Sequence, residues 1–302
     1  MDIIRPDNHT FPLLESFVQQ YEEKCVLLCS HIRRHSDKIF MLIHNSSLNG
    51  SFVSIDKTEI QANNITKESI MGVVYLDSTV FHCIPSPSRF TKEDTDIFIN
   101  FVKKFMNGKK IKCISGENEG TTFLEKLCKE NGKDSFQTNN YKLMTITKPF
   151  PDNYVLPYMS DDDKIIRCTE KEIDELFNIQ KKYLQDEVAP KGKEVTDLEV
   201  KMTLRQILKN QLCLAVFSDG LVCSKANTNA IGINWIQIGG VYTHPLYRRN
   251  GYALNLVYTI CKRALKVGKN ITLFVKEKNQ AAIALYNKLG FHTQGLYKIV
   301  YY

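Results

Sequence analysis

Residues 241–253 read Val-Tyr-Thr-His-Pro-Leu-Tyr-Arg-Arg-Asn-Gly-Tyr-Ala, and this stretch decides the fold. Before it, the apolar residues from Ile233 to Thr243 indicate a strand. After it, apolar side chains recur at helical spacing from Tyr252 to about Lys266. The first turn of a helix has unpaired backbone N–H groups and the positive end of the helix dipole, so it attracts anions. The stretch therefore predicts a strand, an anion-binding loop and a long helix in immediate succession.

The side chains of this loop suit a phosphate group. Arg248 and Arg249 place guanidinium groups beside the helix start, and guanidinium pairs well with phosphate oxygens. Gly251 lets the backbone approach a bulky anion closely, and the small side chain of Ala253 leaves the next turn clear. His244 is expected to cap the loop or to face solvent rather than to act as a base, because it alternates with the preceding strand residue.

A second motif lies one helix and one strand further on, where Asn279 is followed by Ala282 and by Leu-Tyr-Asn-Lys-Leu-Gly-Phe at residues 285–291. Together with Arg248-x-x-Gly251-x-Ala253, it makes residues 164–302 resemble the GCN5-related N-acetyltransferase (GNAT) superfamily. The first motif is similar to the family's coenzyme A pyrophosphate loop, with alanine where many members have glycine. The second is similar to the family's second cofactor motif. The resemblance implies an α/β (α+β) fold with a mixed sheet and acetyl-coenzyme A as donor.

The resemblance also implies where the cofactor binds. The pantetheine arm would lie between two splayed parallel strands, residues 236–243 and 271–276, with a bulge at Gly239-Gly240 starting the splay. Main-chain groups would contact pantetheine and the acetyl carbonyl, the latter as an oxyanion donor, and Asn279 would bond the pantetheine amide. The implied cofactor-binding residues are Val241, Tyr242, Thr243, Arg248, Arg249, Asn250, Gly251, Tyr252, Ala253, Asn279 and Tyr286.

Three residues are candidates for proton transfer. Tyr286 sits where family members often carry a tyrosine that protonates the leaving thiolate, and a phenol of pKa near ~10 can donate to a thiolate of pKa near ~8.5. The alternative is a helix aromatic packed under the sheet. The family has no single fixed base for the amine. Glu187 follows the first helix of this half and Glu277 ends the cofactor strand; either could act directly or through water, or be a solvated surface carboxylate.

The clearest break in the sequence is the proline-containing stretch at residues 148–163, which ends in an acidic run. It predicts two tandem α/β domains, residues 1–150 and 160–302. The second has the expected order β-α-α-β-β-β-α-β-α-β-β, with two closing strands within residues 291–302. Residues 115–127 and 275–289 both run from a strand through a polar loop into an amphipathic helix. This indicates a divergent internal duplication, two unrelated halves being the alternative.

The first half is expected not to bind coenzyme A. At the position of the arginine-rich loop, residues 83–91 contain no glycine for close approach and one arginine, Arg89. We therefore expect a degenerate, non-catalytic copy of the same fold that shapes or covers the acceptor pocket.

The composition indicates how many domains the chain contains, which partners suit it and in which compartment it is found. A length of 302 residues, 43% hydrophobic and 24% charged, suits two globular domains. The net charge of +7 suits an anionic cofactor, and the basic stretch at residues 103–112 indicates a solvated helix end, so no nucleic-acid partner is expected. Nine irregularly spaced cysteines, the absence of an apolar run near ~20 residues and a start unlike a signal peptide predict a cytoplasmic protein without disulfides.

A metal site is not expected either. Cys25, Cys29, His31 and His35 have a spacing that invites zinc, but on a helix the cysteines share one face and the histidines lie roughly opposite. Core cysteines and surface histidines are the prediction.

Two functions fit these residues. The first is an acyltransferase, a GNAT-type N-acetyltransferase that moves the acetyl group of acetyl-coenzyme A to a primary amine of a small molecule, peptide or protein. Direct attack in a ternary complex is expected, since no cysteine is placed for an acyl-enzyme. The alternative is a non-catalytic acyl-coenzyme A-binding sensor or interaction module; Tyr286 and Asn279 favour the enzyme. The expected partners are coenzyme A and an amine acceptor, without a membrane, in a monomer or homodimer.

Overall fold

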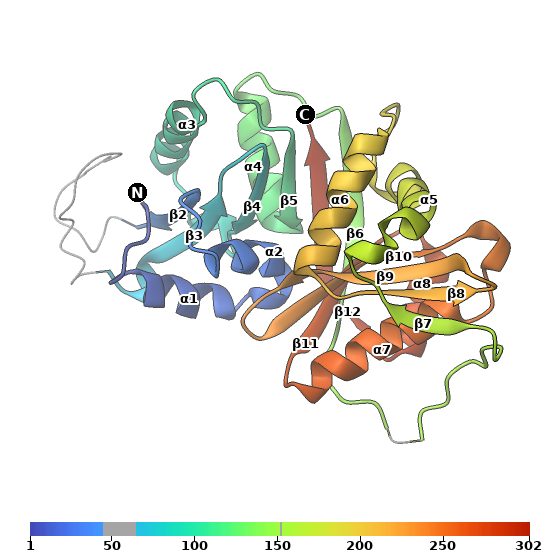
Figure 1. Ribbon diagram of the computed structural model, residues 1–302. Coiled ribbons are helices and arrows are strands. Elements are labelled where there is room, and N and C mark those ends of the chain that lie inside the picture. The colour runs from blue at the N-terminus through green and yellow to red at the C-terminus, as the bar shows by residue number, and fades with distance from the viewer. Residues whose placement is uncertain (45–64, 152) are drawn as a thin grey trace. The chain divides into compact units, whose positions relative to one another are not determined.

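The computed structural model in Figure 1 describes residues 1–44, 65–151 and 153–302. They form two compact units, residues 1–142 together with 295–302 and residues 143–294. Each unit combines helices with a mixed sheet, which confirms the predicted fold class. Domain boundaries at 1–150 and 160–302 stay a prediction, because compactness does not test independent folding. Among the described residues, no helix combines the length and the apolar character that a membrane span requires.

In the first unit the sheet has the order β1-β2-β3-β4-β5-β12, with β4 and β5 parallel and the other neighbours antiparallel. Helix α3 begins at a capping box formed by Thr91 and Asp94, and it ends at Asn107, whose φ of 41° is left-handed. The elements are β1 (Asp2–Ile4), α1 (Phe11–Gln19), α2 (Glu22–Ile32), β2 (Ile39–Ile43), β3 (Ile70–Tyr75), β4 (Thr79–Cys83), α3 (Lys92–Met106), β5 (Cys113–Glu117) and α4 (Asn118–Glu130).

In the second unit the sheet has the order β6-β11-β10-β9-β8-β7, with β10 and β11 parallel. Thr169 and Glu172 form a capping box at the turn before α5. The elements are β7 (Lys164–Arg167), α5 (Ile173–Tyr183), α6 (Asp197–Asn210), β8 (Cys213–Ser218), β9 (Leu221–Ile231), β10 (Trp235–Thr243), α7 (Tyr252–Lys266), β11 (Asn270–Lys276) and α8 (Gln280–Lys288).

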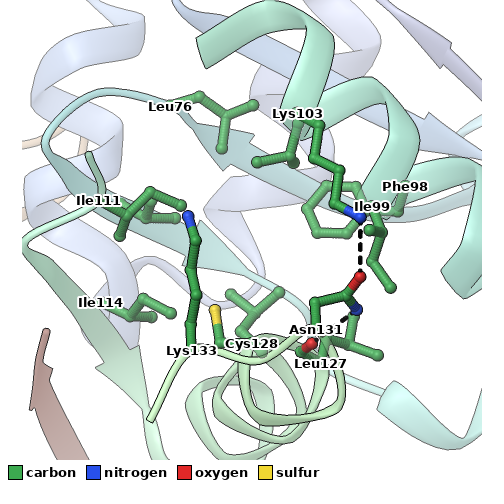
Figure 2. A pocket seen from close by; sticks show the side chains of 13 residues that line it. Leu76, Phe98, Ile99, Lys103, Ile111, Ile114, Leu127, Cys128, Asn131 and Lys133 are labelled. Atoms are coloured by element: carbon green, nitrogen blue, oxygen red, sulfur yellow. Dashed lines mark hydrogen bonds between the residues drawn. The ribbon is translucent and has the colours of Figure 1, made fainter. Parts of the chain in front are cut away.

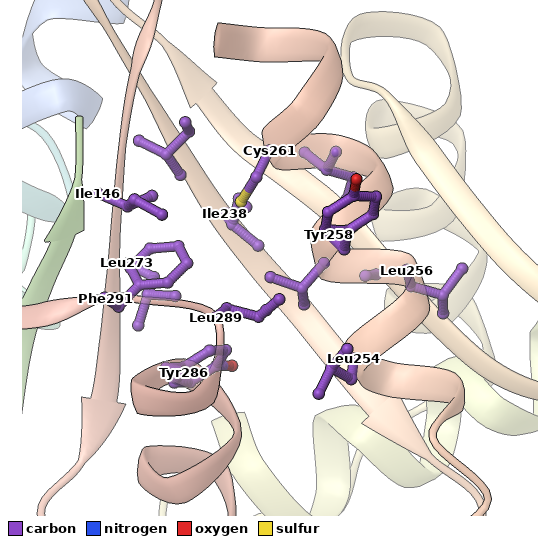
Figure 3. Close-up of a cluster of buried hydrophobic side chains, with 14 of the residues drawn as sticks. Ile146, Ile238, Leu254, Leu256, Tyr258, Cys261, Leu273, Tyr286, Leu289 and Phe291 are labelled. Atoms are coloured by element: carbon purple, nitrogen blue, oxygen red, sulfur yellow. The ribbon is translucent and has the colours of Figure 1, made fainter. Parts of the chain in front are cut away.

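Two apolar clusters hold these helices against opposite faces of the second sheet. Leu214 of β8 belongs to the cluster that contains α7 and α8, which Figure 3 shows. Its neighbour Cys213 belongs to the cluster that contains α5 and α6. Successive strand residues point to opposite faces, so the two helix pairs cover the sheet from both sides.

Each sheet takes a strand from the other part of the sequence. After α4, strand β6 (Gln137–Ile146) enters the second unit, where residues 143–146 lie beside β11. After α8, strand β12 (His292–Tyr301) enters the first unit, where Tyr297–Tyr301 pair with Glu117–Cys113 of β5. The prediction of two closing strands within residues 291–302 is therefore wrong. One strand lies there, and β6 fills the place beside β11.

The first unit repeats the element order of the second. The series β2-β3-β4-α3-β5-α4 corresponds to β8-β9-β10-α7-β11-α8, and in both the strands flanking the middle helix are parallel neighbours. This is the arrangement that the predicted internal duplication requires.

The cysteine and histidine residues of α2 behave differently from one another. Cys25 and Cys29 are buried, as predicted. His31 is not a free surface residue, because its ring stacks on Tyr75 at 4.0 Å and burial lowers its pKa. His35 is exposed and stacks on Phe11 at 4.5 Å. Across the described ranges, no three His, Cys, Asp or Glu residues are grouped so that they could hold a metal ion.

Candidate active site

Strands β10 and β11 separate at one end of their shared ladder. Their parallel pairing runs from Trp235 opposite Asn270 to Ile238 opposite Leu273, yet β10 continues to Thr243 and β11 to Lys276. At this point β10 shifts register against β9, since Gly239 lies opposite Asn227 and Tyr242 opposite Lys225. Two residues of β10 thus span one of β9, and Gly240 has a φ of 59°. The predicted bulge at the glycine pair is confirmed.

The loop after β10 turns through left-handed backbone. Arg249 and Gly251 have φ values of 71° and 77°. A side chain at residue 251 would come within 2.5 Å of Cβ of Pro157, so both its φ and this contact require glycine there. Close approach of a phosphate was the reason expected for a glycine here, and the contact with Pro157 is a second reason within the chain. The side chain of His244 accepts from the main-chain N–H of Leu246 at 3.4 Å, the capping role that was expected.

The N-terminus of α7 is open. No side chain caps it, and Gly251 is its N-cap residue. In the first unit the corresponding helix α3 is closed by Thr91 and Asp94, and the Asp94 carboxylate also pairs with the Met1 ammonium at 3.0 Å. Because a carboxylate at a helix start occupies the site that a phosphate would take, α7 is suited to bind an anion and α3 is not.

The predicted loop residues differ in their exposure to solvent, since the two arginines and Asn250 are exposed whereas Tyr252 is buried. Nε of Arg248 donates to the carbonyl of Thr243 at 3.3 Å, and its guanidinium lies 5.9 Å from the ring centre of Tyr242. Arg249 and Asn250 are exposed. Tyr252 is buried and donates its hydroxyl to Asp163 at 3.0 Å, so only its backbone can face a phosphate. Half-buried Ala253 follows in the first turn of α7.

Asn279 caps the second cofactor helix. Its side-chain oxygen accepts from the N–H of Ala282 at 3.1 Å, at the start of α8. This hydrogen bond fixes the side chain and explains an asparagine there on structural grounds alone. Its bond to pantetheine stays a prediction.

Tyr286 lies on α8 within the cluster of Figure 3, where it is 6% exposed and its ring centre is 5.8 Å from that of Phe291. Burial raises its pKa, and Tyr183, Cys261 and Glu187 raise it further. The hydroxyl therefore stays protonated at physiological pH and can act as a donor. The packing role and the acid role proposed from sequence are both compatible with this position.

Glu187 lies on an unusual stretch of backbone. Helix α5 continues into a π-helical turn, Leu184–Val188, a deviation that is frequent at functional sites. The Glu187 carboxylate pairs with Lys276 at the end of β11, 3.1 Å away. In the same turn Asp186 accepts from the hydroxyl of Tyr242 at 2.6 Å. Burial, followed by this bond, raises the pKa of Tyr242 to about 12.

The other base candidate is less constrained. Glu277 is exposed and follows β11, and its main-chain carbonyl accepts from Gln280 at 2.9 Å. The π-helical turn therefore contacts the ends of both strands, since Glu187 pairs with Lys276 of β11 and Asp186 bonds Tyr242 of β10.

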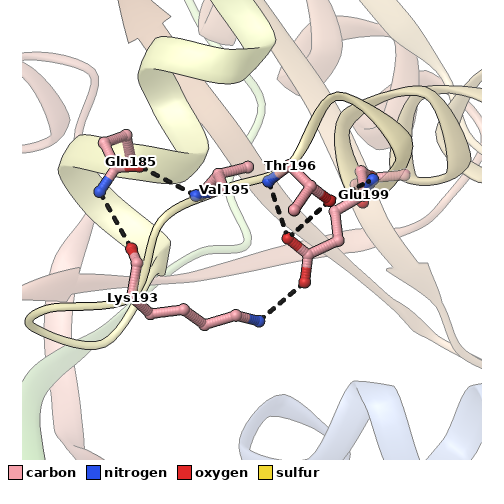
Figure 4. A network of polar contacts seen from close by, with 6 residues as sticks. Gln185, Lys193, Val195, Thr196 and Glu199 are labelled. Atoms are coloured by element: carbon pink, nitrogen blue, oxygen red, sulfur yellow. Dashed lines mark hydrogen bonds and ion pairs between the residues drawn. The ribbon is translucent and has the colours of Figure 1, made fainter.

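The segment between α5 and α6 is held by its own polar network, shown in Figure 4. The Gln185 amide donates to the carbonyl of Lys193 and accepts from the N–H of Val195, both at 3.2 Å. Lys193 pairs with Glu199 at 2.8 Å, and Glu199 forms a capping box with Thr196. These contacts fix the segment that follows Glu187.

Lys225 is the functional candidate that the sequence did not reveal. It lies on β9, is 1% exposed, and donates to the carbonyl of Gly240 at 2.9 Å and to the amide oxygen of Asn227 at 3.1 Å. Its ammonium is 4.8 Å from the ring centre of Tyr183, and burial lowers its pKa to about 8. The available signal was a lysine inside a strand that is buried on both faces.

In the first unit, a histidine lies where the pairing of the two parallel strands ends. The parallel pairing of β4 and β5 ends at Phe81 opposite Ser115, and the next residue, His82, is buried. A side chain at Gly116 would overlap the His82 ring, which bonds the hydroxyl of Thr121 at 2.8 Å. Burial lowers the pKa of His82 to about 4, so the ring is neutral. An imidazole therefore covers β5 where the second unit has its diverging strands.

The first unit also has an apolar pocket, shown in Figure 2. It lies along the later turns of α3 and against α4, with Phe98 and Leu127 among its lining residues. Lys103 borders it and donates to the amide oxygen of Asn131 at 3.0 Å. The pocket is away from the N-terminus of α3, so it lacks an uncapped helix start like that of α7 in the second unit.

Parallel strands that diverge beside an open helix N-terminus are the arrangement that the resemblance to acyl-coenzyme A-dependent acyltransferases implied. Residues 173–291 match the model of the acetyltransferase (GNAT) family, so this part of the chain is a GNAT domain, as the resemblance implied. The family uses acetyl-coenzyme A, and the match supports acyl transfer as the general activity.

Two solved structures share the fold at low sequence identity, and a third aligns over part of the chain. The GCN5-related N-acetyltransferase from Sphaerobacter thermophilus aligns over 99% of this chain and 94% of its own, with a TM-score of 0.56 and 12% identity. A tandem GNAT protein from the clavulanic acid biosynthesis pathway aligns over 77% and 78%, with a TM-score of 0.53 and 11% identity. A putative GNAT-family acetyltransferase from Novosphingobium aromaticivorans is 19% identical over 55% of this chain, with a TM-score of 0.43, and the chain spans 65% of its length. A search of the curated proteins finds no match.

Proposed function

We propose that the second unit transfers the acetyl group of acetyl-coenzyme A to a primary amine, by direct attack in a ternary complex. One observation carries the proposal: the parallel strands β10 and β11 diverge next to the uncapped start of α7. In the proposal, the pantetheine arm lies between these two strands and the pyrophosphate lies at the helix start. The acceptor is a small molecule, a peptide or a protein.

In this proposal the N-terminal amides of α7, with Arg248 and Arg249, hold the pyrophosphate. The main-chain N–H groups of Val241 and Thr243 hold the pantetheine and the acetyl carbonyl, where negative charge develops during attack. Preorganised donors of this kind stabilise the tetrahedral intermediate more than the bound thioester, which is what accelerates the reaction.

Glu187 is the proposed base. Burial raises the pKa of both Tyr286 and Tyr183, and the nearby Glu187 carboxylate raises each of them further. Glu187 accepts a proton from the amine, the amine nitrogen bonds to the carbonyl carbon, and the carbon–sulfur bond breaks. Tyr286 then gives its hydroxyl proton to the leaving thiolate and regains one from solvent or from the base. Glu277, exposed and without these neighbours, is the second choice.

The test is amine-dependent release of coenzyme A by the full chain. We expect release from acetyl-coenzyme A to accelerate with at least one member of a panel of small amines and lysine-containing peptides, with the acetylated amine detected by mass spectrometry. Tight binding of acetyl-coenzyme A with release that no amine accelerates would overturn catalysis in favour of a binding module.

Replacing Arg248 by alanine is expected to weaken acetyl-coenzyme A binding about tenfold, because one charge-assisted contact to the pyrophosphate is lost. Arg263, exposed in the last turn of the same helix, provides the control, since Arg263→Ala removes the same charge at the opposite end. Isothermal titration of both variants gives the dissociation constants. An unchanged constant for Arg248→Ala would show that the pyrophosphate lies elsewhere.

A further inference from the structure

Lys225 is a costly residue in the position that it occupies. It is 1% exposed, and its hydrogen bonds go to neutral acceptors, the carbonyl of Gly240 and the side-chain oxygen of Asn227. Transferring an ammonium group from water into a protein interior is unfavourable unless its bonds compensate. A methionine or leucine would fill the same space without this cost, so the ammonium group itself needs an explanation.

The bulge leaves one peptide group of β10 outside the regular ladder. The register with β9 passes from Gly239 to Tyr242, so the ladder does not fix the intervening residues Gly240 and Val241. Lys225 bonds the Gly240 carbonyl at 2.9 Å. It therefore provides a contact that the sheet does not supply.

Because the peptide group between Gly240 and Val241 is planar, the bond to its carbonyl also sets the direction of its N–H. The described residues contain no cis peptide bond, so the carbonyl of Gly240 and the N–H of Val241 point in opposite directions. When the ammonium of Lys225 holds the carbonyl, it also directs the Val241 N–H away from Lys225. Asn227 packs closely against Gly240 as well, since a side chain at residue 240 would overlap it and lie 2.8 Å from Nζ of Lys225.

We propose that Lys225 is a positioning residue, whose bond to the Gly240 carbonyl presents the Val241 N–H to the pantetheine arm. The inference rests on the proposed function, in which this amide is a cofactor contact. Lys225 does not touch the cofactor or the acceptor. It acts through the peptide plane between Gly240 and Val241.

The test compares two ligands in the full chain. Acetyl-coenzyme A spans the loop and the strands, whereas adenosine 3′-phosphate 5′-diphosphate contains only the part that the α7 N-terminus and its arginines bind. Lys225→Met should bind acetyl-coenzyme A about tenfold more weakly, the value of one well-oriented hydrogen bond, and bind the nucleotide unchanged. Lys225→Arg keeps the charge and the donors, and should bind acetyl-coenzyme A more tightly than Lys225→Met.

Lys269 provides a matched control, because it also bonds main-chain carbonyls, here just before the start of β10. These are the carbonyls of Gly232 and Ile233, and Lys269→Met should leave the ratio of the two affinities unchanged. If Lys225→Met weakens both ligands equally, or neither, the positioning role is wrong. If the unchanged protein binds neither ligand, the proposed function fails. Hydrogen exchange of the Val241 amide then decides the positioning alone: faster exchange in Lys225→Met supports it, and an equal rate overturns it.

Discussion

Replacing Val300 by aspartate is expected to unfold the first unit while the second stays folded. Val300 is fully buried in β12, opposite Ile114 of β5, which is 2% exposed. A carboxylate there has neither water nor a partner, so the substitution should cost about 4 kcal/mol or more. That is a large share of the total stability of an ordinary domain.

Hydrogen exchange measures the effect in each unit separately. Amides of β5 and α4 should lose protection in Val300→Asp, whereas those of α7 should keep theirs. Leu296→Asp is the control, because Leu296 lies on the same strand but is 45% exposed, and surface changes usually stay within about 0.5 kcal/mol. Full protection of β5 in Val300→Asp, or equal loss in α7, would contradict the assignment of this strand to the first unit.

The features that the sequence predicted well depend on near neighbours. The second helix of the expected order is α6, whose capping box joins Thr196 to Glu199, three residues apart. The bulge at Gly239-Gly240 needs a residue that tolerates positive φ, and a glycine in the sequence indicates such a position directly. The turn and the uncapped start of α7 are also local, because they involve one loop and the first amides of one helix.

The exchanged strands could not be predicted in this way. The hydroxyl of Ser115 on β5 bonds that of Tyr297 on β12 at 2.9 Å, across 182 positions of sequence. Residues 137–146 and 292–301 each have a strand-forming pattern, but such a pattern does not say which edge a strand will join. That choice depends on hydrogen bonds and packing with distant elements, so the closing hairpin was the simpler and incorrect prediction.

Lys225 illustrates a second limit. A lysine in a strand usually faces water, and its burial here follows from α5 covering this face of the sheet, with the ring of Tyr183 4.8 Å away. Sequence motifs point to residues that would contact a cofactor directly. A residue such as Lys225, which in our proposal only orients the backbone, is not part of any such motif.

Replacing Tyr286 by phenylalanine is expected to lower kcat about 100-fold without changing acetyl-coenzyme A affinity. The ring is 6% exposed and packs within the cluster of α7 and α8, so phenylalanine retains the packing and removes only the hydroxyl. General acids contribute about 10²–10⁴ in rate when the leaving group needs a proton. Since burial raises the Tyr286 pKa, the hydroxyl should remain protonated, and its ionisation should cause no loss of activity between pH 7 and about 10.

Tyr258→Phe separates the acid role from packing. Tyr258 belongs to the same cluster and is 9% exposed, but it lies on α7 and stacks on Tyr154 at 5.2 Å. Loss of its hydroxyl should leave kcat within about threefold, because it has no part in the proposed proton transfer. Unchanged turnover in Tyr286→Phe would remove this tyrosine from the acid role. An equal loss in both variants would assign the effect to the packing of α8 against α7, and the proton on the leaving sulfur would then have to come from another donor.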